Sequence, residues 1–388
     1  MTRSLSLLGG LPATRFLERY WQKEPLVVRG AFPAFRDPLT PDELAGLACE
    51  ASVDSRLVME RGGKKPWQVT RGPQKAAALK RLPRTHWTLL VESMDRHSAE
   101  IAALASAFSF LPRWRMDDVM VSLSPVHGTV DAHIDSYDVF LIQGQGRRRW
   151  EVDRRAVADY RLGLDLRILK KFRPEASWDL EPGDMLYVPP GVGHRGVSVP
   201  SAAEIALTYS VGFRAPSSAD LISSLLSRTV ARDSPRLFSD AGRPAVQNAG
   251  ELNTRDLAAL KRFLTTEVDA SAPDEWALAA GEAVTAGGGG SGARRGMKAG
   301  AISRRLREGA RVVPAAGARL AWSRVDNGRA ALFVNGESRV LARDEAFAAS
   351  FLCGGASRDA GRRLAASPAL LLLLADLLRA GVVALSGR

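Results

Sequence analysis

The chain has 388 residues, of which 54 are Lys or Arg and 42 are Asp or Glu, so its formal net charge is +12. At about 100–200 residues per domain this length predicts two or three domains, and 46% apolar with 25% charged residues excludes a disordered or collagen-like chain. Its two cysteines, Cys49 and Cys353, lie far apart, which argues against a disulfide framework or a cysteine-based zinc finger and favours the reducing cytoplasm.

The N-terminal half changes from helical to β patterning along its length. Apolar spacing predicts a helix over residues 16–22, and residues 25–29 form a short apolar run typical of a strand. Between residues 110 and 215, short apolar runs are separated by Gly and Pro turns, and they lie at 119–123, 139–142 and 185–188. Many short strands with such turns predict a sandwich or barrel.

The C-terminal half is more helical and carries most of the basic excess. Its predicted elements are helices over 219–228 and 254–266, a Gly-rich linker over 286–300, a hairpin around Asn335-Gly336 and a last helix from Ser367 to Gly381. Residues 294–329 hold ten basic and two acidic residues, whereas residues 1–215 hold 30 and 25. No apolar run is long enough to span a bilayer, so no membrane association is expected.

Three polar residues in the β-rich region suggest a metal site. His133 and Asp135 are two apart, so on a strand they point to the same face, and His194 ends a distant strand after a Pro-Gly turn. Two histidines and one carboxylate form the facial triad of non-haem Fe(II) oxygenases. The alternative is that His133 is a surface histidine and Asp135 a turn residue, but the two segments together favour the metal site.

The segment Arg147-Arg148-Arg149-Trp150 suggests an anion partner. On a strand, Arg148 and Trp150 share one face while Arg147 and Arg149 share the other. Arg148 inside a barrel would need an anionic partner, and a dicarboxylate cosubstrate could supply it through a bidentate contact. The alternative is three solvated arginines or a phosphate-binding stripe.

These motifs resemble a known family. The His133/Asp135/His194 spacing, residues 143–150 (QGQGRRRW) and residues 182–194 are similar to JmjC-type cupins, a class of 2-oxoglutarate oxygenases. Residues 20–26 (YWQKEPL), 110–122 (FLPRWRMDDVMVS) and 209–216 (YSVGFRAP) resemble, more narrowly, the bacterial ribosomal oxygenases. That family hydroxylates an arginine of the sixteenth large-subunit ribosomal protein, and the resemblance is dense over residues 16–216.

The resemblance implies roles for individual residues. His133, Asp135 and His194 would bind iron as the catalytic centre, and Arg148 would hold the distal carboxylate of 2-oxoglutarate. Ser122, Thr208 and Ser210 would be hydrogen-bonding neighbours of this cosubstrate. The implied cofactors are Fe(II), 2-oxoglutarate as cosubstrate, and O₂. His127, in the loop before His133, is interpreted as a loop residue and not as a fourth ligand.

An arginine substrate calls for a carboxylate and an apolar or aromatic wall. Asp118 and Met120 share a strand face with Ser122, and Tyr137 has the parity of His133 and Asp135, so these three are the candidate substrate-binding residues. The alternative for Asp118 is a charged edge, and for Met120 and Tyr137 it is simple core packing.

The sequence therefore predicts an α+β fold in which a double-stranded β-helix, the cupin or JmjC jelly roll, precedes a helical region and a small winged-helix-like α/β domain. The expected boundaries are 1–216 for the oxygenase domain, 217–285 for a helical dimerisation region, 286–300 for the linker and 301–388 for the last domain. The expected partners are a ribosomal protein substrate and a second copy of the chain, without direct nucleic-acid binding. The alternatives are a cupin-fold regulatory or nucleic-acid-binding protein, and a JmjC hydroxylase or demethylase with another protein substrate.

Overall fold

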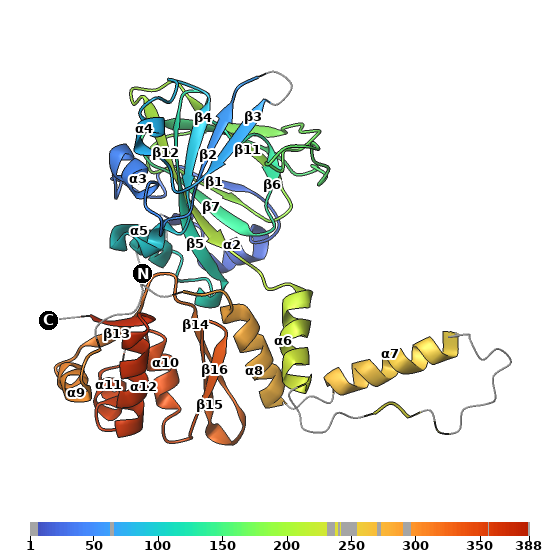
Figure 1. Ribbon diagram of the computed structural model, residues 1–388, viewed down its shortest axis with the longest axis vertical. Coiled ribbons are helices and arrows are strands. Elements are labelled where there is room, and N and C mark those ends of the chain that lie inside the picture. The colour runs from blue at the N-terminus through green and yellow to red at the C-terminus, as the bar shows by residue number, and fades with distance from the viewer. Residues whose placement is uncertain are drawn as a thin grey trace. The chain divides into compact units, whose positions relative to one another are not determined.

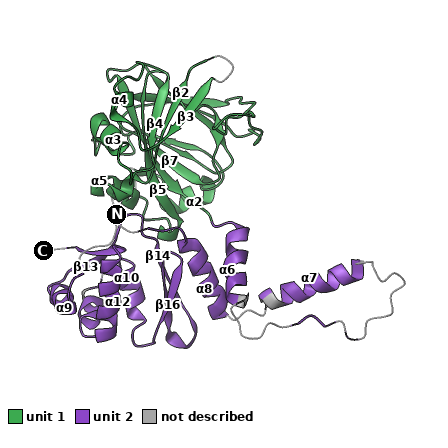
Figure 2. Cartoon of the chain, in the orientation of Figure 1, with its two compact units in different colours: residues 1–215 green, residues 216–388 purple. Residues whose placement is uncertain are grey.

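The computed structural model divides the chain into two compact units, residues 1–215 and 216–388 (Figure 2). The residues that the structure describes are 7–62, 66–230, 237–239, 241, 254–269, 273–289, 296–355 and 357–386. Residues 290–295 of the predicted linker at 286–300 thus lie outside the described residues. Within the part that is described, no helix has the length and apolarity needed to cross a membrane.

The first unit contains two antiparallel sheets (Figure 1). The larger sheet has eight strands in the order β1-β10-β7-β12-β5-β4-β2-β3. Its strands are β1 (Leu26–Val28), β2 (Ser55–Glu60), β3 (Trp67–Arg71), β4 (Trp87–Val91), β5 (Met116–Pro125), β7 (Asp138–Gln143), β10 (Met185–Val188) and β12 (Ile205–Phe213). The smaller sheet has the order β6-β11-β8-β9, with β6 (His133–Ile134), β8 (Arg147–Asp153), β9 (Ala176–Leu180) and β11 (Gly193–Val199).

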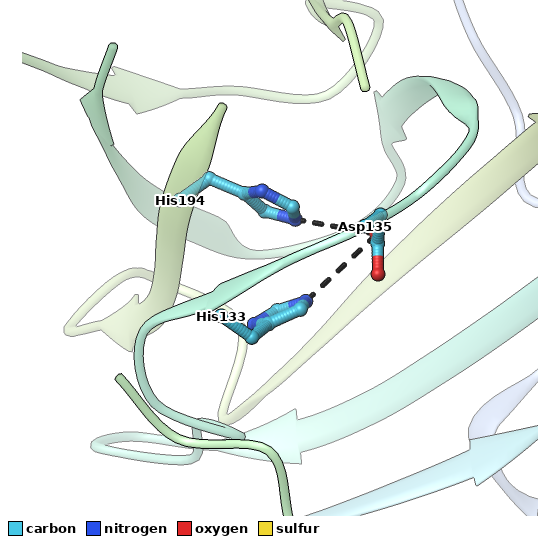
Figure 3. Close-up of side chains that lie close together, drawn as sticks. All are labelled: His133, Asp135 and His194. Atoms are coloured by element: carbon cyan, nitrogen blue, oxygen red, sulfur yellow. Dashed lines mark ion pairs between the residues drawn. The ribbon is translucent and has the colours of Figure 1, made fainter. Parts of the chain in front are cut away.

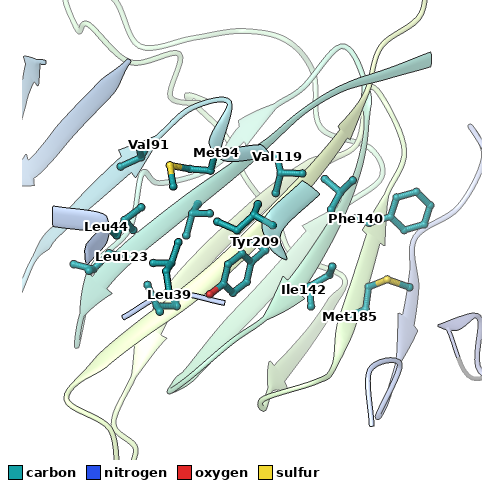
Figure 4. Close-up of a cluster of buried hydrophobic side chains, with 14 of the residues drawn as sticks. Leu39, Leu44, Val91, Met94, Val119, Leu123, Phe140, Ile142, Met185 and Tyr209 are labelled. Carbon is teal, nitrogen blue, oxygen red and sulfur yellow. The ribbon is translucent and has the colours of Figure 1, made fainter. Parts of the chain in front are cut away.

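The larger sheet has an apolar outer face. Residues of neighbouring strands, such as Leu123, Tyr209 and Phe140, belong to one buried cluster (Figure 4). The helices of this unit are α2 (Ala13–Arg19), α3 (Pro41–Leu47), α4 (Ala76–Leu79) and α5 (Ala99–Ser106), with short 3₁₀ turns at η1 (Met94–Arg96) and η2 (Arg113–Arg115). Residues of α2, α3 and α5 join the same cluster, so this face is covered.

The opposite face of the larger sheet looks toward the smaller sheet. A second buried cluster combines Val139 and Leu186 of the larger sheet with Trp150 and Val152 of the smaller one. Because side chains alternate along a strand, the residues between the outer-face positions of β4, β5 and β12 point into the space between the sheets. Two facing antiparallel sheets confirm the predicted sandwich or barrel, and all candidate site residues lie in this unit.

The first predicted helix is displaced. It spans Ala13–Arg19, whereas the sequence predicted residues 16–22. Gln22 has φ +58°, and its backbone N–H donates to the Tyr187 hydroxyl at 2.7 Å. This left-handed backbone ends the helical path before Gln22 and directs the chain into β1.

The second unit combines helices with two small sheets. It contains α6 (Ser218–Val230), α7 (Thr254–Asp269), α8 (Pro273–Thr285), α9 (Ala299–Arg307), β13 (Arg311–Pro314), β14 (Leu320–Arg324), η3 (Asp326–Gly328), β15 (Ala330–Val334), β16 (Glu337–Leu341), α10 (Phe347–Leu352), α11 (Arg358–Leu364), α12 (Pro368–Arg379) and β17 (Val383–Ser386). β13 pairs with β17, and β14-β15-β16 form a second sheet. The positive φ angles of Asn335 (52°) and Gly336 (94°) confirm the predicted hairpin.

The sheet β14-β15-β16 is covered on both faces. On one face, Phe333 of β15 packs against Gly281 of α8, where a side chain larger than glycine would collide with the ring. On the other face, Leu320 and Leu332 join a buried cluster with α10 and α12. The helical and α/β segments of residues 216–388 therefore form one compact unit, and the winged-helix-like description of its last part stays a prediction.

Candidate metal centre and cosubstrate pocket

His133 and His194 face each other across a strand pair. β6 and β11 are antiparallel, and their register places His133 directly opposite His194, with ring centroids 4.3 Å apart. Asp135 follows His133 by two residues, and one of its carboxylate oxygens lies 3.5 Å from Nε2 of His194 and 4.0 Å from Nε2 of His133. One ligand atom from each residue lies within 4.8 Å of the others (Figure 3).

Both imidazoles are oriented for metal binding. Nδ1 of His133 donates to the Asp131 carbonyl at 2.9 Å, and Nδ1 of His194 donates to the Val192 carbonyl at 3.1 Å. Since a carbonyl can only accept, the proton of a neutral ring is on Nδ1, and the Nε2 lone pairs point at Asp135. Burial, followed by the neighbouring His133, lowers the pKa of His194 to about 4, so this ring is neutral at pH 7. The three residues therefore form a preorganised N,N,O donor set.

Arg148 is buried between the two sheets, as its strand parity predicted. Its side chain is 2% exposed, while Arg149 next to it points outward and pairs with Asp179. Nη1 donates to Ser124 Oγ at 2.9 Å and Nη2 to the Gly196 carbonyl at 3.1 Å. No carboxylate of the described residues forms an ion pair with it, and burial alone lowers its pKa to about 10. It is therefore a protonated guanidinium without a counter-ion.

The Trp150 ring connects Arg148 to the histidines. The Trp150 ring lies 6.0 Å from the His194 ring and 5.2 Å from Cζ of Arg148. Gly196 lies opposite Trp150 on β11, and a Cβ there would be 2.6 Å from Nε of Arg148 and 2.7 Å from the Trp150 ring. Only glycine leaves room for both side chains at this position.

Buried polar atoms without partners lie on the inner faces of both sheets. Nε of Arg148 and Oγ1 of Thr88 are both buried without a hydrogen-bond partner among the described residues. Thr88 is fully buried and shares its strand face with Leu90, which pairs with Ser122. An unmade buried hydrogen bond costs about 1–3 kcal/mol, so a ligand that supplied acceptors here would recover that energy. The residues present fit an anionic, oxygen-rich cosubstrate next to a metal.

The three predicted neighbours of the cosubstrate are all buried on this inner face. Ser122 of β5 lies opposite Thr208 of β12, and Ser210 is two residues further along the same face. Oγ1 of Thr208 donates to the side-chain oxygen of Gln143 at 3.3 Å, and the Gln143 amide donates to the Leu207 carbonyl at 3.0 Å. The structure thus brings them together as a polar band, and their contact with a cosubstrate stays a prediction.

The predicted substrate residues lie toward the other end of the same face. Ser93 N–H donates to Asp118 at 2.8 Å, and a Cβ on Gly212 would lie 3.6 Å from Asp118 Oδ1 and 3.8 Å from Cε2 of Tyr137. Asp118 and Tyr137 are therefore neighbours, and Met120 lies opposite Ser210. Burial, followed by the charges of Glu92, Asp117 and Asp95, raises the pKa of Asp118 to about 7. Burial and the Asp135 charge also raise the pKa of Tyr137.

Sequence reasoning missed four residues of the site. Thr88, Ser124, Gln143 and Ser198 contribute polar side-chain atoms to the inner face, and Ser124 and Ser198 join the two sheets through a 2.7 Å hydrogen bond between their hydroxyls. The signal was the alternation of Ser122 and Ser124 with apolar residues on β5. His127 is exposed, and its ring lies 4.9 Å from that of His86, which agrees with its interpretation as a loop residue.

Comparisons with known proteins place this site in a family. A JmjC domain model matches residues 103–221. The ribosomal protein uL16 3-hydroxylase of Escherichia coli strain K12 is 42% identical over 251 residues, which are 64% of this chain and 65% of that protein. A probable ribosomal oxygenase of Haemophilus influenzae is 33% identical over 257 residues, 64% of this chain and 62% of that protein. These alignments thus cover less than two thirds of either relative.

Solved structures extend the likeness over nearly the whole chain. The X-ray structure of E. coli YcfD has a TM-score of 0.83 and 33% identity, covering 97% of this chain and 98% of that one. The chain belongs to the JmjC ribosomal oxygenase family. Among solved ribosomal oxygenases, YcfD in complex with cobalt and 2-oxoglutarate has a TM-score of 0.81, 33% identity and coverage of 97% and 99%. The predicted JmjC/cupin α+β fold is confirmed.

Proposed function

We propose that this ribosomal oxygenase is an Fe(II)- and 2-oxoglutarate-dependent protein hydroxylase that acts on an arginine of the sixteenth large-subunit ribosomal protein. The observation that carries the proposal is the buried, uncompensated Arg148 guanidinium, which the Trp150 ring connects to His194 of the three-residue donor set. The names of the E. coli relatives, a uL16 3-hydroxylase and a YcfD solved with cobalt and 2-oxoglutarate, support both the substrate and the cosubstrate.

His133, Asp135 and His194 would hold the iron. A facial triad occupies one side of the metal and leaves the other side open. Fe(II) with 2-oxoglutarate, when bound, supplies the activation of O₂ that inserts one oxygen atom into a C–H bond, with succinate and CO₂ as co-products. The backbone carbonyls of Asp131 and Val192 keep the two imidazoles in the tautomer that binds metal.

Arg148 would bind the distal carboxylate of 2-oxoglutarate and so set the direction of the cosubstrate. Its Nε, now without a partner, and the Thr88 hydroxyl are the donors that this carboxylate would satisfy. Ser124 holds the guanidinium in place, and Ser122, Thr208 and Ser210 line the path toward the metal. The surrounding apolar cluster of Trp150, Val139 and Leu141 excludes water from this end.

Asp118 would receive the guanidinium of the substrate arginine. An ionised carboxylate in a partly dehydrated site pairs strongly with a bidentate donor, and the nearby acidic residues Glu92, Asp117 and Asp95 add a favourable field. Tyr137 and Met120 would form the walls along the aliphatic part of the side chain. Substrate and cosubstrate thus enter opposite ends of one barrel and meet at the iron ligands.

Mass spectrometry tests the reaction. Purified protein incubated with Fe(II), 2-oxoglutarate, O₂ and a uL16-derived peptide should add the mass of one oxygen atom to an arginine and form succinate in equal amount. Replacing that arginine by lysine in the peptide should abolish the shift. Formaldehyde release from a methylated peptide without hydroxylation would favour a demethylase, and modification of histidine or asparagine would favour a hydroxylase with another substrate.

We further propose that the protein acts as a homodimer through α6 and α7. These helices expose apolar side chains that include Ile222 (64% exposed), Leu226 (54%), Leu257 (50%) and Leu264 (63%). Helices with such apolar stripes gain stability by packing against another surface. Light scattering after gel filtration should give twice the monomer mass, and L257D together with L264D should give the monomer. A wild-type monomer at micromolar concentration would contradict this proposal.

A further inference from the structure

The second unit contains a cavity of about 540 Å³ at the open end of the β14–β15 pair, beside the first turn of α10. β14, β15 and α10 are labelled in Figure 1. The cavity is lined by Trp322 and Arg324 of β14, by Gly328 and Arg329 of the following turn, and by Phe347 and Ser350 of α10. Its size lies in the range of about 300–1,000 Å³ that is typical of small-molecule sites.

Two aromatic rings form its apolar walls. The indole of Trp322 is 40% exposed, although Leu332, its cross-strand neighbour, is fully buried. Phe347 carries the guanidinium of Arg363 only 3.9 Å above its ring centroid, so one of its faces is already stacked. Trp322 therefore offers an open planar surface inside a cavity, which is the requirement for stacking a flat ring.

Arg324 and Arg329 line the cavity, Arg363 lies beside it on the ring of Phe347, and no Asp or Glu lines it. Arg324 and Arg363 form no ion pair with any carboxylate of the described residues, and the side chain of Arg343 packs on Gly328, where a Cβ would lie 3.2 Å from it. Arg329 differs, because it is paired with Asp274 at 2.7 Å. Arg324 and Arg329 also belong to the basic segment 294–329. The cavity thus combines a flat apolar wall with free positive charge.

We propose that this cavity binds a nucleotide, with the base stacked on Trp322 and the phosphate on Arg324 and Arg363. Stacking on an aromatic wall together with guanidinium contacts to phosphate is how proteins hold single nucleotides without reading a duplex. The Ser350 hydroxyl adds a hydrogen-bonding group at the side of the base. The nucleotide can be free or part of a single-stranded RNA, because both present the same base and phosphate. This site is separate from the proposed oxygenase reaction and does not depend on it.

Fluorescence anisotropy with dye-labelled AMP and a dye-labelled oligoadenylate on the full-length protein tests the proposal. R324E should weaken binding of the preferred probe about tenfold or more, since it exchanges a phosphate contact for a repulsion. W322L should weaken it by a similar factor, because the base loses its stacking partner. R379E is the matched control, because Arg379 is exposed, lies on α12 and pairs with Asp376 outside the cavity. Circular dichroism confirms that each variant is folded.

The outcomes separate the sources of the nucleotide. If AMP binds at least as tightly as oligoadenylate, the ligand is a free nucleotide. If oligoadenylate binds much more tightly than AMP, the ligand is an RNA strand. If R379E weakens binding as much as R324E, the attraction is general surface charge and the proposal is overturned. Absence of binding of both probes at millimolar concentration also overturns it. If W322L fails to fold, S350A and R363Q provide the same comparison.

Discussion

The two ends of the barrel interior carry ionisable groups of opposite charge, the buried Arg148 and the half-buried Asp118. At one end, burial lowers the pKa of the Arg148 guanidinium to about 10, and at the other, burial raises the pKa of the Asp118 carboxyl to about 7. Neither group forms an ion pair within the described residues, and both are held by neutral donors or acceptors, Ser124 and Ser93. Keeping either group charged therefore lowers the stability of the fold, and each group is complementary to a ligand of opposite charge.

This difference would let the barrel distinguish the two organic substrates that we propose for it. A dicarboxylate is attracted to Arg148 and repelled by the acidic group around Asp118, while an arginine side chain experiences the reverse. Between them lies the donor set of His133, Asp135 and His194.

Removal of a metal ligand should abolish the reaction of both substrates. H133A and D135A should each lower succinate formation more than about 100-fold, because the donor set is incomplete and both substrates lose their common reaction centre. H127A is the matched control, since His127 is exposed in the loop before the site and should keep its activity. Succinate assays by NMR measure the effect, and full turnover in both ligand variants would refute the assignment.

Changing Arg148 should affect the cosubstrate end alone. R148Q should raise the KM for 2-oxoglutarate about 10- to 100-fold, because the charge-assisted hydrogen bond from Nε to the distal carboxylate, worth about 1.5–3 kcal/mol, is lost. R149Q is the control on the same strand, where the side chain points outward to Asp179. Equal KM values in R148Q and R149Q would show that another group binds the distal carboxylate.

Changing Asp118 should affect the substrate end alone. D118N should raise the KM for the arginine peptide about tenfold and leave the KM for 2-oxoglutarate unchanged, because one charged partner is lost. In the wild type, the peptide KM should rise as the pH falls below about 7, since protonation removes the Asp118 charge. The D118N variant should lack this pH dependence. An unchanged profile in the variant would assign the titration to another group.

Thr88 should contribute a smaller part of cosubstrate binding. T88V removes a buried hydroxyl that has no partner, so it should raise the KM for 2-oxoglutarate about three- to tenfold while leaving the protein without ligand at least as stable. Succinate assays measure the KM, and thermal unfolding without and with 2-oxoglutarate measures the stability and the binding of the ligand. If the variant lost stability and kept its affinity, the hydroxyl would serve the fold rather than the ligand.

The stability of the first unit should show the cost of Asp118. Its pKa is raised from 3.8 to about 7, so the folded state holds a proton in this interval that the unfolded chain has released. The Asp118 carboxyl therefore destabilises the folded state most above pH 7. This penalty shrinks as the pH falls from 7 toward 3.8. D118N should melt about 2–5 °C above the wild type at pH 8, with the difference vanishing near pH 4. Melting curves at both values check the sign.

Local patterns predicted the chemical centre of the site but not its full lining. The two-residue spacing of His133 and Asp135 and the parity of Arg148 and Trp150 follow from strand geometry, so both could be predicted. Thr88 and Ser198 could not, because their burial depends on which distant strands become neighbours. The first helix was displaced for a similar reason, since Gln22 turns out of the helical path where it contacts Tyr187, 165 residues away. The cavity at Trp322 likewise depends on the placement of α10 against β14.

Calorimetric titration of the Co(II)-loaded protein, with oxygen excluded, tests the central claim most directly. Binding of 2-oxoglutarate and of the arginine peptide would be measured for wild type, R148Q and D118N. We predict that R148Q weakens only 2-oxoglutarate and D118N weakens only the peptide. If either variant weakened both ligands equally, the two ends would not act as separate sites of opposite charge, and the account would be wrong.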